Sequence, residues 1–203
     1  DKNPAIKIKP FPTKSRDRFL QPTEISDFMN ALNSMNNDKL KDYVLLLLLT
    51  GQRRGNIESL RWSHIDFHNN IMYLPHTKNG DSQHIPLTEQ AVILLKSIKD
   101  KQNRAKADWI FPSTKSKSGH IEGADVFWQQ LLKSAGLKDL HLHDLRRTMA
   151  SYQAILGSSM NIIGKSLGHK SIQSTAVYAR LNLSPVRDSM QKATNEIFKL
   201  SEK

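Results

Sequence analysis

Residues 143–178 read HDLRRTMASYQAILGSSMNIIGKSLGHKSIQSTAVY, and this stretch decides the fold of the C-terminal half. It predicts helices at about 143–156, 159–167 and 171–180. Gly168 suits the end of the second helix, because glycine readily adopts the left-handed conformation that closes a helix. His169 would then stand at that helix end. On the first helix, His143 and Arg146 are three positions apart and share a face.

The remaining sequence predicts a mainly α-helical domain with one small antiparallel β-sheet, an α+β fold. A helix is expected to begin at Thr23 as its N-cap, and further helices are expected at about 38–50, 55–60, 88–103, 123–135 and 184–200. Residues 71–74 and 84–87 flank Asn79-Gly80, a pair typical of a tight hairpin turn. The apolar run at 43–49 is far shorter than the about 20 residues that cross a bilayer, so we expect a buried helix.

The first 20 residues predict an extended basic linker. They hold six Lys or Arg and three Pro, with little apolar periodicity. Packing is expected to begin near Thr23. The chain starts with Asp1 rather than Met and shows no signal-peptide pattern. We therefore expect a processed chain or a fragment of something longer.

Charge and cysteine content narrow the function classes. The 203 residues carry 30 Lys+Arg against 19 Asp+Glu, a formal net charge of +11. This surplus fits a polyanionic partner such as nucleic acid, or a generically basic protein. The absence of cysteine excludes Cys-ligated zinc, iron–sulfur clusters and thiol nucleophiles. It is consistent with a reducing compartment.

Four short motifs could bind or cleave a phosphodiester, although each is weak alone. His143 and Arg146 suit an anionic phosphate, but such a pair is also common on polar helix faces. Arg53 follows a helix that ends at Gly51, where a phosphate could bind or a basic pair could simply be solvated. Lys78 at the hairpin turn could reach a DNA groove or stay in solvent. Tyr178 could be a nucleophile or a core residue.

Taken together and in order, these motifs closely resemble the catalytic domain of the tyrosine recombinase, or phage integrase, family. The resemblance covers about residues 20–195. Its T-G-x-R, hairpin-lysine, H-x-x-R, L-G-H and tyrosine positions fall on Thr50–Arg53, Lys78, His143–Arg146, Leu167–His169 and Tyr178. One departure is Asn56, where many members have Glu, and it puts the local bonding of the first arginine in doubt.

Three strings resemble a subgroup, the integrases of prophages and genomic islands of Gram-negative bacteria. They are R-R-x-N at 53–56, HTKNG at 76–80 and IIGKSLGHKS at 162–171. In that subgroup two DNA-binding domains precede the catalytic one. The resemblance thus implies a linker from missing N-terminal domains at 1–20, a catalytic domain at 21–183, and a C-terminal helix at 184–203 that could dock on a neighbouring protomer.

The resemblance also implies the chemistry. A tyrosine cleaves one DNA strand and forms a 3′-phosphotyrosine with a free 5′-hydroxyl, and strand exchange integrates or excises a mobile element. In this sequence the nucleophile would be Tyr178, and the base or proton relay would be His143. Lys78 would protonate the leaving oxygen. The phosphate would be held by Arg53, Arg146 and His169.

The implied partners follow from the same family. No cofactor or metal is expected, and the partner is double-stranded DNA, contacted also by Lys7, Lys9, Arg54, Arg147 and Lys170. The family implies a homotetramer on DNA, while we expect the isolated domain to be a monomer. Accessory DNA-bending or excision factors could take part. No membrane association is expected, and the site of action would be the bacterial cytoplasm, at the nucleoid when bound to DNA.

Four alternatives remain open from the sequence. One is another role within the same family, the resolution of chromosome dimers. A type IB topoisomerase would share the Arg, Lys, His and Tyr site but religate the same strand. A non-catalytic DNA-binding protein, such as a decayed recombinase, would keep the basic surface. A metal hydrolase could use His64, His68, His141 and His143, although the sequence has no HExxH motif.

Overall fold

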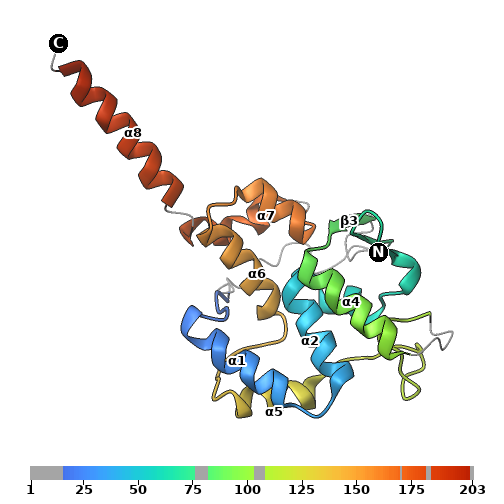
Figure 1. The fold of residues 1–203 in the computed structure, drawn as a ribbon. Helices are drawn as coiled ribbons and strands as arrows, with labels where there is room; N and C mark the ends of the chain where they lie inside the picture. Colours follow the sequence, from blue (N-terminus) through green and yellow to red (C-terminus); the bar gives the residue numbers. More distant parts are fainter. Residues whose placement is uncertain (1–15, 76–81, 103–107, 170, 182–183, 202–203) are drawn as a thin grey trace, which may run out of the picture.

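The computed structural model describes residues 16–75, 82–102, 108–169, 171–181 and 184–201. The fold is mainly helical with one small sheet, as the sequence predicts, and one helix projects from the body (Figure 1). The α-helices are α1 Pro22–Ser34, α2 Asp38–Thr50, α3 Arg54–Glu58, α4 Glu89–Lys101, α5 Asp125–Ser134, α6 Asp144–Ile155, α7 Met160–Leu167 and α8 Ser184–Ser201. Short 3-10 helices are η2 Trp62–His64, η3 Ile172–Ser174 and η4 Ala176–Leu181.

The sheet has three antiparallel strands in the order β1-β2-β3. They span β1 Ile65–Asp66, β2 Ile71–Leu74 and β3 Gln83–Pro86. Pairing of Met72 with Ile85 buries both side chains, whereas the neighbouring pair, Tyr73 and His84, faces solvent. The expected hairpin strands are thus confirmed. The turn itself lies outside the described residues, and β1 was not expected, because two residues are too few to show an alternating pattern.

Helix α2 forms the centre of the domain and packs against α4 and α6. Tyr43, Leu46 and Leu47 are buried, so the apolar run is a core helix, as expected. Gly51 ends α2 with φ +61°. A Cβ at Gly51 would stand 3.0 Å from the Met149 side chain of α6. Glycine is therefore required there both by the backbone conformation and by the close approach of α6.

The start of the domain differs from the expectation. Helix α1 begins at Pro22 with Gln21 as its N-cap, so the proposed cap at Thr23 is wrong. Proline favours the first helical position because its missing N–H needs no partner there. Packing also begins earlier than expected: Phe19 and Leu20 are buried, and the Leu20 N–H donates to Thr148 Oγ1 of α6 at 3.0 Å.

The segment expected as one helix over 171–180 consists of η3 and η4. The two 3-10 helices are separated by Thr175, which is fully buried. Its carbonyl accepts the Tyr178 N–H at 3.0 Å, a bond between residues three apart rather than four. The tyrosine therefore lies on a tight turn whose position depends on one buried threonine.

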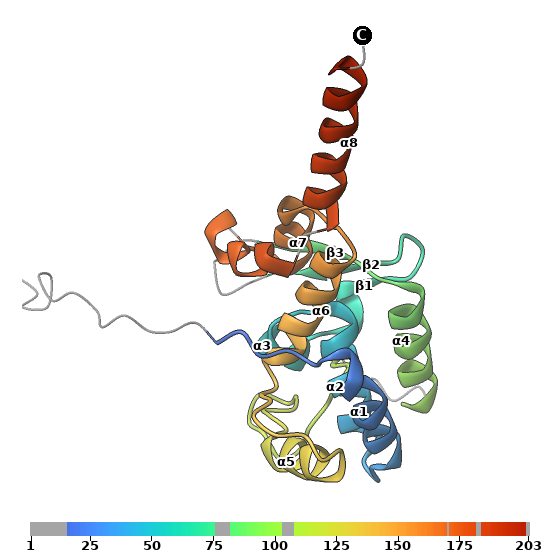
Figure 2. The same ribbon diagram turned by 90° about the vertical axis from the view of Figure 1, so that its left-hand side faces the viewer.

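Helix α8 extends away from the remaining helices (Figures 1 and 2). Its large apolar side chains are exposed: Val186, Met190, Ile197, Phe198 and Leu200. The helix expected at 184–200 is confirmed. Within the described part of the chain, no helix is both long and apolar enough to cross a membrane.

Candidate active site

Arg146 of the H-x-x-R motif connects the T-G-x-R motif with the L-G-H motif. It lies one turn into α6, whose N-cap is His143, and its side chain is nearly buried. Its Nη1 donates to the Gly51 carbonyl at 2.9 Å, and its Nη2 donates to the Leu167 carbonyl at 2.7 Å. A charged group bonded to main-chain carbonyls on two other elements fixes their mutual arrangement.

Arg53 follows the end of α2 and is the N-cap of α3. Its Nη1 atom is buried and has no hydrogen-bond partner within the described residues. The pKa of Arg146 falls to about 10, chiefly because of burial and then because of the nearby charge of Arg53. Two guanidinium groups that repel each other, one with an unsatisfied donor, are arranged for an anion.

The two histidines of the motifs stand beside these arginines. Burial lowers the pKa of His143, and the charges of Arg146 and Arg147 lower it further. Burial lowers the pKa of His169 to about 4, with further contributions from Arg146 and Arg53. His169 is therefore neutral near pH 7, where a neutral imidazole offers one N–H donor and one nitrogen acceptor.

Thr175 orients the His169 ring and was missed by the sequence reasoning. His169 Nδ1 and Thr175 Oγ1 are 2.8 Å apart. Gly164 of α7 makes room for the threonine, because a Cβ there would stand 3.2 Å from Thr175 Oγ1. A threonine among other small polar residues gives no sequence signal for such a contact.

Tyr178 is 7% exposed and packs with Ala150, Ala154, Ile163 and Leu167. Burial raises the pKa of its hydroxyl, while the positive charges of Arg146 and Arg147 oppose that rise. The hydroxyl of Tyr178 thus lies within electrostatic reach of Arg146 and Arg147. In this form it keeps its proton near pH 7 and would need a base to become a nucleophile.

The structure brings together five of the six residues expected in the active site: Arg53, His143, Arg146, His169 and Tyr178. Each of the two histidines feels the charge of both arginines, and Tyr178 feels the charge of Arg146. The sixth, Lys78, lies outside the described residues, as do Lys7, Lys9 and Lys170.

The two remaining residues expected to bind DNA have protein partners. Arg54 Nε is 2.8 Å from Glu58 Oε1, and Arg54 Nη1 is 3.4 Å from Asp125. Arg147 Nη1 is 2.7 Å from a carboxylate oxygen of Asp144. Glu58 and Asp144 lie four and three residues from these arginines, so both ion pairs could be predicted from helical spacing, whereas the contact with Asp125 could not.

Asn56, the departure from the family pattern, has a buried Nδ2 atom without a hydrogen-bond partner among the described residues. The acidic residue of α3 is instead Glu58, which accepts from Tyr43 Oη at 3.2 Å and from the Gly123 N–H at 2.7 Å. Over the same described ranges, no three His, Asp or Glu residues are grouped so that they could hold a metal ion.

Comparisons with known proteins agree with this geometry. The model of the phage integrase family matches residues 18–184. The integrase of Salmonella phage P22 is 32% identical over 195 residues, covering 89% of this chain and 48% of that protein. Prophage integrase IntF of Escherichia coli K12 is 33% identical over 166 residues, covering 81% and 35% respectively. The chain thus spans about half the length of these relatives, or less.

Solved structures give the same result. The crystal structure of XerA recombinase superposes with a TM-score of 0.70 at 25% identity, covering 93% of this chain and 68% of that one. The catalytic domain of bacteriophage HP1 integrase shares the fold, with a TM-score of 0.63 at 20% identity, covering 85% and 93%. The resemblance inferred from the motifs is confirmed, and the chain belongs to the phage integrase family of tyrosine recombinases.

Proposed function

We propose that this chain is the catalytic domain of a site-specific DNA recombinase that integrates or excises a mobile element through a 3′-phosphotyrosine intermediate. Membership of the phage integrase family supports strand cleavage and rejoining as the activity. The observation that carries the proposal is the cluster of Arg53, Arg146, His143 and His169 beside a buried tyrosine. Such a cluster suits a phosphodiester and the greater negative charge of its transition state.

The arginines would hold the scissile phosphate. The free Nη1 of Arg53 supplies a donor that has no partner in the described part of the chain. Arg146 uses two donors for main-chain carbonyls and retains others, because a guanidinium has five N–H groups. An anion between Arg53 and Arg146 would relieve their mutual repulsion, which favours binding of a phosphate there.

Tyr178 would be the nucleophile and His143 its base. The lowered pKa of His143 leaves a neutral ring that can accept the phenolic proton. A bond forms between Tyr178 Oη and phosphorus, and the bond from phosphorus to the 5′-oxygen breaks. The departing 5′-alkoxide needs a proton, and we assign its donation to Lys78.

His169 would donate a hydrogen bond to the phosphate. Its Nδ1 is paired with Thr175 Oγ1 at 2.8 Å. When the threonine hydroxyl donates to Nδ1, the proton of the neutral ring resides on Nε2, which then faces the site as a donor. Thr175 would therefore select the tautomer that the phosphate requires.

The partners follow from this reaction. Double-stranded DNA would also be contacted by basic residues away from the phosphate pocket: Lys7, Lys9, Arg54, Arg147 and Lys170.

We assign residues 1–20 to a linker from upstream DNA-binding domains, 21–183 to the catalytic domain and 184–203 to a docking helix. The exposed apolar side chains of α8 support docking on a neighbouring protomer, in a tetramer on DNA that forms from monomers. DNA-bending or excision factors would assist in the cytoplasm at the nucleoid.

Trapping on nicked DNA tests the proposal without knowledge of the target site. The chain is incubated with duplexes of randomised sequence around a nick placed just 3′ of the potential cleavage position, so that a short 5′-hydroxyl strand diffuses away. We expect a covalent protein–DNA adduct that resists denaturant, with the 3′-phosphate linked to Tyr178 by mass spectrometry.

Two variants make this result specific. Tyr178→Phe should retain DNA binding and form no adduct. Tyr73→Phe removes the hydroxyl of an exposed tyrosine on β2 and should form the adduct normally. Absence of any adduct from the unmodified chain, or an adduct formed by Tyr178→Phe, would contradict the proposed function.

A further inference from the structure

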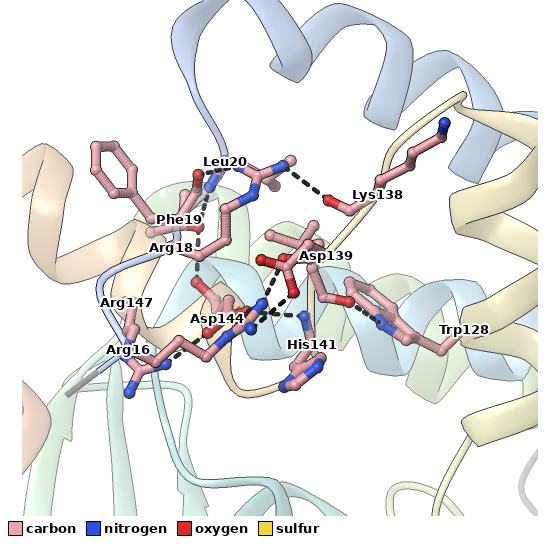
Figure 3. Close-up of polar contacts among 12 residues, drawn as sticks. Arg16, Arg18, Phe19, Leu20, Trp128, Lys138, Asp139, His141, Asp144 and Arg147 are labelled. Atoms are coloured by element: carbon pink, nitrogen blue, oxygen red, sulfur yellow. Dashed lines mark hydrogen bonds and ion pairs between the residues drawn. The ribbon is translucent and has the colours of Figure 1, made fainter. Parts of the chain in front are cut away.

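A fully buried carboxylate lies at the start of the helix that carries His143 and Arg146. Asp144 accepts hydrogen bonds from Arg147 Nη1 at 2.7 Å and from the main-chain N–H of His141 at 2.8 Å. Arg16 adds a second cation, with Nη2 at 3.1 Å and Nε at 3.2 Å from Oδ2 (Figure 3). The side chain of Asp144 has no exposed surface.

Arg16 reaches this site from a distant part of the sequence, 128 residues before Asp144. Its Nη1 also bonds Asp139 Oδ1 at 2.8 Å, in the loop before α6, and its Nη2 contacts the Asp139 carbonyl. Figure 3 shows the Arg16 side chain lying between the two carboxylates. The segment in which the described chain begins is therefore attached to the first turn of α6.

The same segment also reaches the tyrosine-bearing turn. Asp17 Oδ2 forms an ion pair with Arg180 Nη1 at 2.7 Å. Arg180 stands two residues after Tyr178 on η4. A small hollow between these elements is lined by Arg16, Asp17, Arg147 and Tyr178 together with their neighbours. Two successive residues, Arg16 and Asp17, thus contact two of the elements that carry candidate catalytic groups, the start of α6 and η4.

Because the Asp144 carboxylate is buried, the folded state requires the contacts that satisfy its charge. A carboxylate without access to water is strongly unfavourable unless cations and N–H donors satisfy it. Arg147 lies on α6 itself, so its bond to Asp144 fixes nothing outside that helix. Arg16 is the partner that links the carboxylate to a separate segment of the chain.

We propose that Arg16 and Asp144 are positioning residues: the ion pair between Arg16 and the buried Asp144 holds the first turn of α6, and with it His143 and Arg146, to the segment through which the chain enters the catalytic domain. This inference rests on the proposed function for its catalytic consequence. Displacement of the entering segment would loosen the site, so that docking of this segment becomes a condition for strand cleavage.

The first test measures the site without DNA. In protein labelled with ¹³C at histidine, NMR follows the titration of His143, whose surroundings include Asp144 and the cations Arg146, Arg147 and Arg53. Arg16→Ala leaves the carboxylate less neutralised, which should raise the pKa of His143. Asp144→Asn removes the negative charge and should lower it. Opposite shifts would show that Arg16 and Asp144 lie close enough to act on His143 through their charges, whereas general loosening of the fold would shift the pKa of His143 in the same direction in both variants.

Arg18→Ala is the matched control. Arg18 lies in the same segment and has the same charge, but it pairs with Glu24 of α1 at 2.6 Å. It should leave the titration of His143 unchanged. An unchanged His143 titration in Arg16→Ala, or equal shifts in Arg16→Ala and Arg18→Ala, would overturn the proposal even if the chain cleaves no DNA.

The second test uses a duplex recovered from the trapping experiment. At saturating DNA, Arg16→Ala should slow adduct formation by about tenfold to a hundredfold, as expected for a misplaced catalytic group. Arg18→Ala should slow it by less than about twofold, since its partner Glu24 belongs to α1 and is itself partly exposed, whereas Asp144 is fully buried. If Arg16→Ala only weakens DNA binding and keeps the saturated rate, Arg16 is a DNA contact and the positioning role is refuted.

Discussion

Lowering the pH should destabilise the domain through His169. The pKa of this histidine is about 4 in the fold and 6.5 in the unfolded chain. Between these values the unfolded chain binds a proton that the folded chain does not. The stability that depends on neutral His169 is therefore complete above pH 6.5 and is lost as the pH falls toward 4.

The size of this loss follows from the two pKa values. Their full separation corresponds to about 3 kcal/mol. His169 is partly exposed, so screening by solvent reduces the effect, and we expect about 1 kcal/mol between pH 7 and pH 5. For a domain of this size, that loss lowers the urea midpoint by about 0.5 M.

The assay is equilibrium unfolding in urea, followed by tryptophan fluorescence at pH 7 and pH 5. His169→Asn is the informative variant, because its amide can still meet Thr175 but cannot titrate. Other groups, including His143, titrate in both proteins and cancel in the comparison. The variant should lose about 1 kcal/mol less than the unmodified chain. Equal losses in the two proteins would refute the proposed environment of His169.

Other perturbations test the remaining parts of the site. Gly168→Ala should destabilise the domain by at least about 1 kcal/mol in urea unfolding, because φ is +68° and the new Cβ meets the Gln83 side chain; unchanged stability would contradict that packing. Lys78→Ala should slow cleavage by roughly 10²–10⁴, and a 5′-bridging sulfur should restore the rate; without rescue, Lys78 is not the acid. The logarithm of the DNA-binding constant should fall by about 0.9 per phosphate contact for each log unit of salt, and a salt-independent constant would show that the positive charge does not bind DNA.

Much of the fold could be predicted because local rules and the tertiary structure agree. Gly51 and Gly168 both adopt positive φ where the sequence indicates helix ends. The hairpin strands and the buried helix α2 follow from apolar patterning. Strand β1 and the division of 171–180 could not be predicted, because they depend on pairing with β2 and on the buried Thr175 rather than on local sequence.

Prediction of the candidate site from the sequence is limited in the same way. The order of the motifs predicts that Arg53 and Arg146 lie together, but not that Arg146 bonds two main-chain carbonyls, which carry no residue-specific signal. Arg147 is expected from the sequence to contact DNA, yet in the structure it pairs with Asp144. Asp144 lies three residues before Arg147, so this ion pair could have been predicted from helical spacing. The approach of Arg16 to Asp144 could not have been predicted, because the two residues are far apart in the sequence.

The two carbonyl bonds of Arg146 have a consequence for how such a domain degenerates. The guanidinium connects the end of α2 with the end of α7, so one side chain serves the chemistry and holds the architecture. Most substitutions there leave two buried carbonyls without their donors. A gene copy that drifts at this codon should yield an unstable chain, cleared by proteases, rather than an inert protein that still occupies its DNA site and blocks the intact enzyme.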